Sequence, residues 1–258
     1  MDGAKGLVLA AANSGVVDVY VKYIGTLVGR DKACRLGQYF ARLLAYVVGR
    51  RITRAGKTPG LADWLSALVK VQQTLGTARK VMRTGKFVGF LQQAVRTLAG
   101  SGDEVVRALG AAHKLGMCVF MAADTWGLLG ALALVRVRDA GRVARVGQRA
   151  WMWALAAQLA SALYQLHAVS LRAADLKRVR FHVEKAADAV AGRECAVEEQ
   201  AIRVQRTALA RQLAATALDL CIPIKGLGVL PLNEGLVAAA GTVTSLMGVQ
   251  DVLAKAAQ

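Results

Sequence analysis

Basic side chains recur at helical spacing between residues 79 and 96. On a helical projection four of them gather on one side: Arg79, Arg83, Lys86 and Arg96. The opposite side is apolar and carries three large side chains: Phe87, Leu91 and Val95. Guanidinium and ammonium groups bind phosphate oxygens, and large apolar side chains enter the acyl region of a bilayer. The pattern predicts a helix that binds an anionic lipid membrane, although a surface helix of a soluble bundle has the same two-sided composition.

Residues that could catalyse a reaction or hold a metal ion lie far apart in the chain. The four cysteines form no CxxC pair, and the three histidines fall on separate segments. The chain also lacks the sequence motifs of dinucleotide-binding proteins, P-loop NTPases, zinc proteases and serine hydrolases. We therefore expect a protein that is not an enzyme and that uses no cofactor and no metal.

The elements that position the basic side chains are predicted to be long helices. Residues 31–50 show the clearest helical periodicity, and their polar face mixes acidic with basic groups, which suits helix packing as well as lipid. Helical spacing continues upstream, which predicts one helix over residues 18–50 with a bend near Gly25 or Gly29. A loop with glycine and proline follows, and a second helical region is predicted over residues 61–98.

Three apolar segments in the second half are candidates for membrane insertion. Residues 150–171 form a run of 22 residues without Lys, Arg, Asp or Glu, which could cross the hydrocarbon layer of about 30 Å or form a buried helix. Residues 115–135 have a similar length but include Asp124, so this helix either packs against partners or never spans. Residues 235–250 are uncharged and rich in small residues that permit close helix packing. To span, this last segment could take length from residues 226–233 before it, crossing Glu234, or it could be re-entrant.

The composition favours a membrane protein over the other classes that fit a basic chain. The 258 residues are 55% apolar and 5% aromatic, with a net charge of +17 and a mean hydropathy of +0.38. Such a chain is too apolar to be disordered and too poor in aromatic residues for a β-sandwich. We therefore expect an all-α membrane protein, with long amphipathic helices in the N-terminal half and apolar, membrane-embedded helices in the C-terminal half. The excess positive charge is then attracted to anionic lipid, and no nucleic-acid partner is expected.

Charge and hydropathy divide the chain into four regions. Residues 1–114 form a basic amphipathic helical region with a net charge of +12. Residues 115–171 form an apolar helical pair with a short basic connection, and residues 172–211 form a charged helical region. Residues 212–258 form a C-terminal apolar membrane segment. Most of the positive charge therefore precedes the segments that could enter a bilayer.

Seven residues near the N-terminus follow the order of a known family signature. The segment VKYIGTLVGRDKACRLGQYFARLL, residues 21–44, has a GRDK element, then an arginine and a Gln-Tyr pair. These positions are Gly29, Arg30, Asp31, Lys32, Arg35, Gln38 and Tyr39. The segment closely resembles the signature of the peroxin-11 family of peroxisomal membrane proteins. Residues 79–92, RKVMRTGKFVGFLQ, resemble the second basic block of that family, and residues 121–129, MAADTWGLL, resemble its middle region.

The resemblance implies an integral protein of the peroxisomal or glycosomal membrane that drives elongation, proliferation and fission of the organelle. In that family an amphipathic helix of the N-terminal half inserts into one leaflet and bends it, and the proteins self-associate as homo-oligomers. The family also implies recruitment of the fission machinery, including a dynamin-type GTPase. A pore or channel for small metabolites is the alternative function, and Asp124, Gln158 and Gln165 could line its path.

Overall fold

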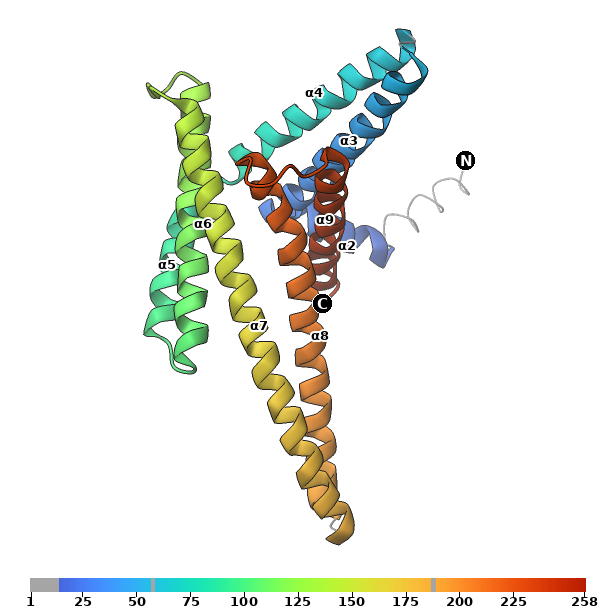
Figure 1. Cartoon of the computed structure of the whole chain (residues 1–258), viewed down its shortest axis with the longest axis vertical. Helices are drawn as coiled ribbons and strands as arrows, with labels where there is room; N and C mark the ends of the chain where they lie inside the picture. Colours follow the sequence, from blue (N-terminus) through green and yellow to red (C-terminus); the bar gives the residue numbers. More distant parts are fainter. Residues whose placement is uncertain (1–13, 57–58, 187–188) are drawn as a thin grey trace, which may run out of the picture.

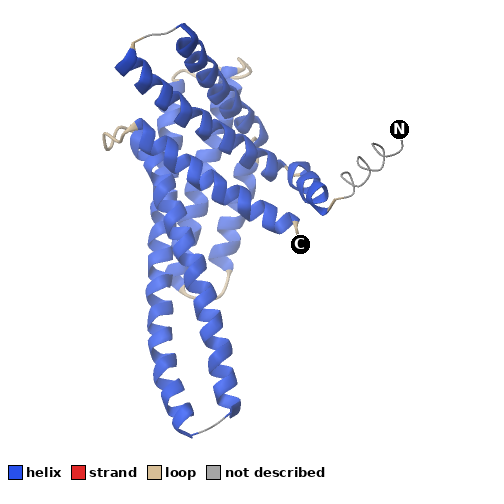
Figure 2. Ribbon diagram, turned by 90° about the vertical axis from the view of Figure 1, so that its right-hand side faces the viewer, coloured by secondary structure: helices blue, strands red, loops and turns tan. Residues whose placement is uncertain are grey.

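The computed structural model describes residues 14–56, 59–186 and 189–258. Within these ranges all regular structure is helical, and no β-strand is present (Figure 2). The helices are α2 (Gly15–Gly25), α3 (Leu27–Ala55), α4 (Pro59–Met82), α5 (Lys86–Ala99), α6 (Glu104–Ala131), α7 (Ala140–Ala186), α8 (Ala189–Gly226) and α9 (Glu234–Ala256). The predicted all-α class is confirmed.

The long N-terminal helix predicted over residues 18–50 is divided at Thr26. This residue has extended backbone dihedrals, φ −93° and ψ 144°, and its Oγ1 accepts a hydrogen bond from the backbone N–H of Gly29 at 2.9 Å. Thr26 therefore caps α3 and turns the chain away from α2. A Cβ atom at Gly29 would lie 1.9 Å from the carbonyl oxygen of Tyr23, so the turn requires glycine. The bend expected near Gly25 or Gly29 is present, but as a break between two helices.

The helical region predicted over residues 61–98 is also interrupted. α4 ends at Met82 and α5 begins at Lys86, and Gly85 between them has a positive φ of 79°, which favours glycine. The turn separates Arg79 and Arg83 from the apolar side chains that follow on α5, whereas Lys86 and Arg96 stay on that helix. The single amphipathic helix that we expected here is therefore wrong.

Helices that follow each other along the chain pack side by side. α3 packs with α4, α5 with α6, α6 with α7, and α7 with α8, while α9 returns to α3 and α8 (Figure 1). The long helices α7 and α8 extend together beyond the other helices, as Figures 1 and 2 show. A buried apolar cluster joins them: Ala162, Val169, Ile202 and Leu209. The composition boundaries that we drew after residues 114, 171 and 211 fall inside α6, α7 and α8.

Two helices of the described part are long and apolar enough to cross a membrane by length and composition, α6 and α9. α7 is not one of them, although it contains the candidate segment at residues 150–171. Gln158 and Gln165 lower the hydropathy of that segment, and Ala154 and Ala162 are fully buried against neighbouring helices. The segment packs against neighbouring helices of the bundle, in agreement with the buried helix that was one of its two alternatives.

α9 extends the apolar segment at its C-terminal end, whereas we expected added length at its N-terminal end. It begins at Glu234 and continues beyond residue 250 to Ala256, so it takes no length from the residues before it. The carboxylate of Glu234 pairs with Nε of Arg42 at 2.5 Å and with Nζ of Lys225 at 3.0 Å. The acidic residue therefore lies at the helix end, where two basic groups neutralise it.

Candidate functional site

Small residues bring α9 against α3. A Cβ atom at Gly241 would lie 2.1 Å from the ring of Tyr39, and a Cβ atom at Gly235 would lie 2.4 Å from the ring of Tyr46. Two aromatic side chains of α3 thus rest directly on the backbone of α9. The close packing predicted from the small residues of this segment is confirmed, and it fixes the orientation of α3.

A cavity of about 880 Å³ lies beside this contact, with walls from the six helices α3 to α8. Five of the seven signature residues line it: Asp31, Lys32, Arg35, Gln38 and Tyr39. The second basic block contributes four residues: Arg79, Lys80, Arg83 and Lys86. Asp124, from the segment that resembles the middle region of the peroxin-11 family, lines the cavity as well. The three segments that carry the resemblance therefore meet around one cavity.

The other two signature residues shape the turn between α2 and α3. Gly29 allows the close approach to the carbonyl group of Tyr23, and Nε of Arg30 donates a hydrogen bond to the carbonyl oxygen of Ile24 at 2.7 Å. These contacts orient the start of α3, which carries the five residues that reach the cavity.

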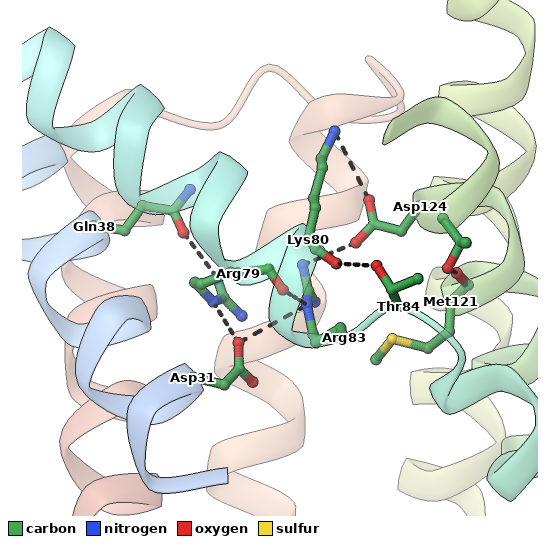
Figure 3. A network of polar contacts seen from close by, with 9 residues as sticks. Asp31, Gln38, Arg79, Lys80, Arg83, Thr84, Met121 and Asp124 are labelled. Carbon is green, nitrogen blue, oxygen red and sulfur yellow. Dashed lines mark hydrogen bonds and ion pairs between the residues drawn. The ribbon is translucent and has the colours of Figure 1, made fainter. Parts of the chain in front are cut away.

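Asp31 is the centre of a buried polar network (Figure 3). The residue is 9% exposed, and its Oδ1 accepts a hydrogen bond from Nε of Arg79 at 3.0 Å. Arg79 also donates from Nη1 to Oε1 of Gln38 at 2.7 Å. Because an unpaired buried carboxylate is costly, the guanidinium group stabilises Asp31, and the pair joins α3 to α4.

Arg83 extends this network to α6. Its Nη2 donates to Oδ2 of Asp124 at 2.8 Å, and its Nε lies 3.8 Å from Oδ1 of Asp31. Nζ of Lys80 approaches the second oxygen of Asp124 at 3.9 Å. Asp124 lies well inside α6, and these partners neutralise its charge there. Of the two outcomes predicted for this helix, packing against partners is therefore the one observed.

Arg35 makes a similar link to α8 and α9. Its Nη2 donates to Oδ1 of Asp219 at 2.5 Å and to Oγ1 of Thr244 at 3.1 Å. Its guanidinium carbon lies 5.6 Å from the centre of the Tyr39 ring, in reach of a cation–π contact. Each aspartate at the cavity thus has an arginine partner, and these pairs join helices from both halves of the chain.

The four basic residues that we predicted to contact lipid headgroups do not lie on one helix face in the structure. The side chains of Arg79 and Arg83 are only 11% and 12% exposed, because the turn at Gly85 leaves them inside the fold, where they pair with aspartates. Lys86 is half-buried and lines the cavity, whereas Arg96 is exposed on α5. The expectation of headgroup contacts is therefore corrected for the two paired arginines.

The exposed surface of α5 has an apolar side and a polar side. The apolar side consists of four side chains that are 48–59% exposed: Val88, Leu91, Val95 and Leu98. The polar side consists of Gln92, Gln93 and Arg96. Phe87 is half-buried, and the Phe90 ring lies 5.9 Å from Nζ of Lys114 on α6. The amphipathic helix is shorter than predicted, but it keeps Leu91, Val95 and Arg96 at the surface.

The described residues contain no group of three or more metal-binding side chains. The four cysteines are free, and the one histidine at the cavity, His113, has its Nδ1 2.9 Å from the carbonyl oxygen of Ala154. This histidine is thus engaged in the contact between α6 and α7.

Two acidic residues of this arrangement were missed in the sequence, Asp219 and Glu234. Asp219 is an isolated carboxylate in the apolar stretch QLAATALDLCIPI, and Glu234 directly precedes an uncharged run. A lone carboxylate in apolar surroundings requires a basic partner, which is the signal that could have identified both.

Comparison with known families tests the resemblance. A family described as peroxisomal biogenesis factor 11 (PEX11) matches residues 17–253 of the chain. The chain belongs to the PEX11 family. The match includes the cavity residues and α5, so the resemblance noted at residues 21–44 extends over nearly the whole chain. The family is not enzymatic and is linked to peroxisome proliferation, in agreement with the expectation that the chain is not an enzyme.

Relatives in fungi and animals resemble the chain over most of its length. It is 28% identical over 247 residues to peroxisomal membrane protein PMP27 of Saccharomyces cerevisiae, with 90% of this chain and 92% of the relative covered. It is 21% identical over 238 residues to peroxisomal biogenesis factor 11 of Schizosaccharomyces pombe, with 89% and 91% covered. It is 24% identical over 252 residues to human peroxisomal membrane protein 11A, with 90% and 94% covered. No solved structure matches the chain. The relatives identify a protein of the peroxisomal membrane, as the family signature implied.

Proposed function

We propose that this protein elongates the peroxisomal membrane, before fission, by inserting the apolar side of α5 into one leaflet. The observation that carries the proposal is the exposed stripe of Val88, Leu91, Val95 and Leu98. In water such a stripe is unfavourable, whereas at the boundary between headgroups and acyl chains it is stabilised. α5 packs against α6, a candidate span, so the exposed stripe lies beside a helix that could enter the bilayer.

The asymmetry of this insertion provides a mechanism for bending. A helix that lies in one leaflet expands that leaflet relative to the other, so the membrane curves. Arg96 on the polar side of α5 contacts anionic headgroups, and a basic residue near such a surface contributes about 1 kcal/mol. Arg79 and Arg83 affect membrane insertion indirectly. Their ion pairs with Asp31 and Asp124 hold the turn from which α5 starts.

Self-association and recruitment of fission machinery complete the proposal. The family resemblance implies that copies of the protein associate as homo-oligomers and that a dynamin-type GTPase acts on the narrowed organelle. Exposed side chains on α9 support a contact with lipid or with a second copy: Leu236, Val243 and Leu246. A local array of inserted helices would bend the membrane more than one copy does.

A separate observation favours a second function, a pore for small metabolites. The cavity beside the candidate span α6 is lined by polar and charged groups, including Asp124 and Gln158. Such groups could line a path for solutes. Gln165 is not among the cavity residues, because its Nε2 donates to Oγ of Ser161 at 3.1 Å within α7.

The experiment uses the full chain reconstituted into vesicles that contain anionic phospholipid, with tubulation measured by electron microscopy. The variant L91N/V95N removes two apolar groups from α5. The control V197N/V204N makes a similar change at two exposed valines of α8, away from α5. We expect tubulation to be lost in the α5 variant and kept in the control. Equal tubulation by the two variants would overturn the proposal.

The pore is tested with the same protein in planar bilayers. A conductance that changes in an Asp124→Asn variant would favour the pore. Closed bilayers, in a preparation that still tubulates vesicles, would count against it.

A further inference from the structure

Three lysines at the cavity lack a close acidic partner. Seven basic and three acidic side chains line the cavity. Each aspartate is held by an arginine at 2.5–3.0 Å, and the remaining arginine, Arg42, is held by Glu234. This leaves Lys32 on α3, Lys80 on α4 and Lys86 on α5. In the described part of the chain, Lys32 and Lys86 have no ion pair, and Lys80 lies 3.9 Å from a carboxylate that Arg83 already occupies.

One of these lysines, Lys32, lies where a positive charge is costly. Burial and the neighbouring guanidinium group of Arg35 lower the pKa of Lys32, so its positive charge is unfavourable there. A bound anion would offset this cost, so Lys32 favours an anionic ligand in the cavity that it lines.

We propose that this cavity binds a doubly charged phosphate group through Lys32, Lys80 and Lys86. Ammonium groups bind phosphate as point charges, and here three lysines from three helices line one cavity. Two of these lysines have no ion pair and the third has only a distant one, so their summed charge exceeds what a single carboxylate can neutralise, which favours a phosphate dianion. The volume of about 880 Å³ lies within the range of about 300–1,000 Å³ found for small-molecule sites.

The phosphate group could belong to a soluble molecule or to a phospholipid headgroup. Two probes distinguish a soluble ligand from a phospholipid headgroup. Inorganic pyrophosphate is added to the full chain in neutral detergent. Phosphatidic acid is placed in phosphatidylcholine nanodiscs that hold the full chain. In both arms the acetylation rate of individual lysines is measured by mass spectrometry, because a bound anion protects the amine that it contacts. Lys22, Lys70 and Lys255, which are exposed and lie outside the cavity, serve as internal controls.

We expect one of the probes to slow acetylation of the three cavity lysines and not of the control lysines. Protection by pyrophosphate assigns the site to a soluble phosphate, and protection by phosphatidic acid alone assigns it to a headgroup. Protection by neither probe, or equal protection of all six lysines, would overturn the proposal. This result needs no substitution and does not depend on whether α5 enters the membrane.

Variants test the same site by affinity, measured calorimetrically with the probe that protects. Loss of a charged hydrogen bond corresponds to about a tenfold loss of affinity, so K32Q/K80Q/K86Q should bind at least tenfold more weakly. The control K22Q/K70Q/K255Q has the same net charge and should bind like the wild type. K32R/K80R/K86R keeps the charge and should retain binding. Its binding would show that the glutamine variant binds weakly because it lacks the charges and not because substitution at these positions disrupts the fold. Equal weakening by the two glutamine variants would show attraction by net charge alone and would contradict the proposal.

Discussion

The guanidinium group of Arg83 lies 2.8 Å from Oδ2 of Asp124 and joins the end of α4 to the interior of α6. Nε of the same side chain lies 3.8 Å from Asp31, so one arginine connects carboxylates from two helices. The turn that leads into α5 is therefore anchored by ion pairs. α5 itself is left with an apolar side exposed, which is the surface that we propose to enter the membrane.

Removal of Arg83 should destabilise the fold. In Arg83→Leu the carboxylate of Asp124, which is 16% exposed, loses its close partner, and breaking a pair that is largely shielded from water costs up to about 3–5 kcal/mol. The double variant R83L/D124L removes both charges and should recover most of that loss. The free energy of unfolding, followed by circular dichroism in detergent, measures the effect. A single variant as stable as the wild type, or a double variant no better than the single one, would contradict this assignment.

An alanine at Gly241 should separate α9 from α3. The added Cβ atom would lie 2.1 Å from the Tyr39 ring, and overpacking of this kind costs about 1–3 kcal/mol. Gly127→Ala is the matched control, since that glycine also lies in a helix but has nothing within 4 Å of a built Cβ atom. We expect a lower melting temperature only for Gly241→Ala. The packing argument fails if both variants melt alike.

Replacement of Lys32 by methionine should raise stability in phosphate-free buffer. Burial, and then the charge of Arg35, lower the pKa of Lys32, so the unfolded chain holds this proton more tightly than the folded chain. Stability therefore rises with pH between the lowered pKa and the ordinary one, where the wild type loses its buried charge. The advantage of Lys32→Met should be largest below the lowered pKa of Lys32 and should shrink across that window. Lys70→Met, at an exposed position of α4, is the control, and a melting temperature below the wild type in Lys32→Met would refute the prediction.

Arg79 and the apolar side of α5 should affect different properties. Arg79→Gln leaves Asp31 without its closest partner and should lower the melting temperature. L91N/V95N changes exposed side chains and should leave the melting temperature unchanged while vesicle tubulation is lost. If Arg79→Gln instead folds as stably as the wild type and loses only membrane binding, the arginine contacts headgroups after all.

The helical class and the two-sided composition of α5 could be predicted because both depend on short-range spacing. The partners of Arg79 and Arg83 could not, because Asp31 is 48 residues from Arg79 and Asp124 is 41 residues from Arg83. Periodicity indicates which face of a helix is polar, but not which helix meets that face.

The break at Gly85 was missed for a local reason. A single glycine within a helical pattern is tolerated, so its sequence context does not distinguish a helical glycine from one with positive φ. At Gly241, by contrast, the small residues of the segment did predict close helix packing. The sequence could not identify the ring of Tyr39 as the contacting group.

The depth of α5 in the membrane tests the central claim most directly. An environment-sensitive fluorophore is attached at Leu91→Cys, Val95→Cys or Gln92→Cys, in a full chain whose four native cysteines are replaced by alanine, reconstituted into anionic vesicles. Insertion of the apolar side predicts apolar emission and quenching by a lipid-borne quencher at positions 91 and 95, and aqueous emission at position 92. Aqueous emission at all three positions, in vesicles that the protein still tubulates, would contradict the account.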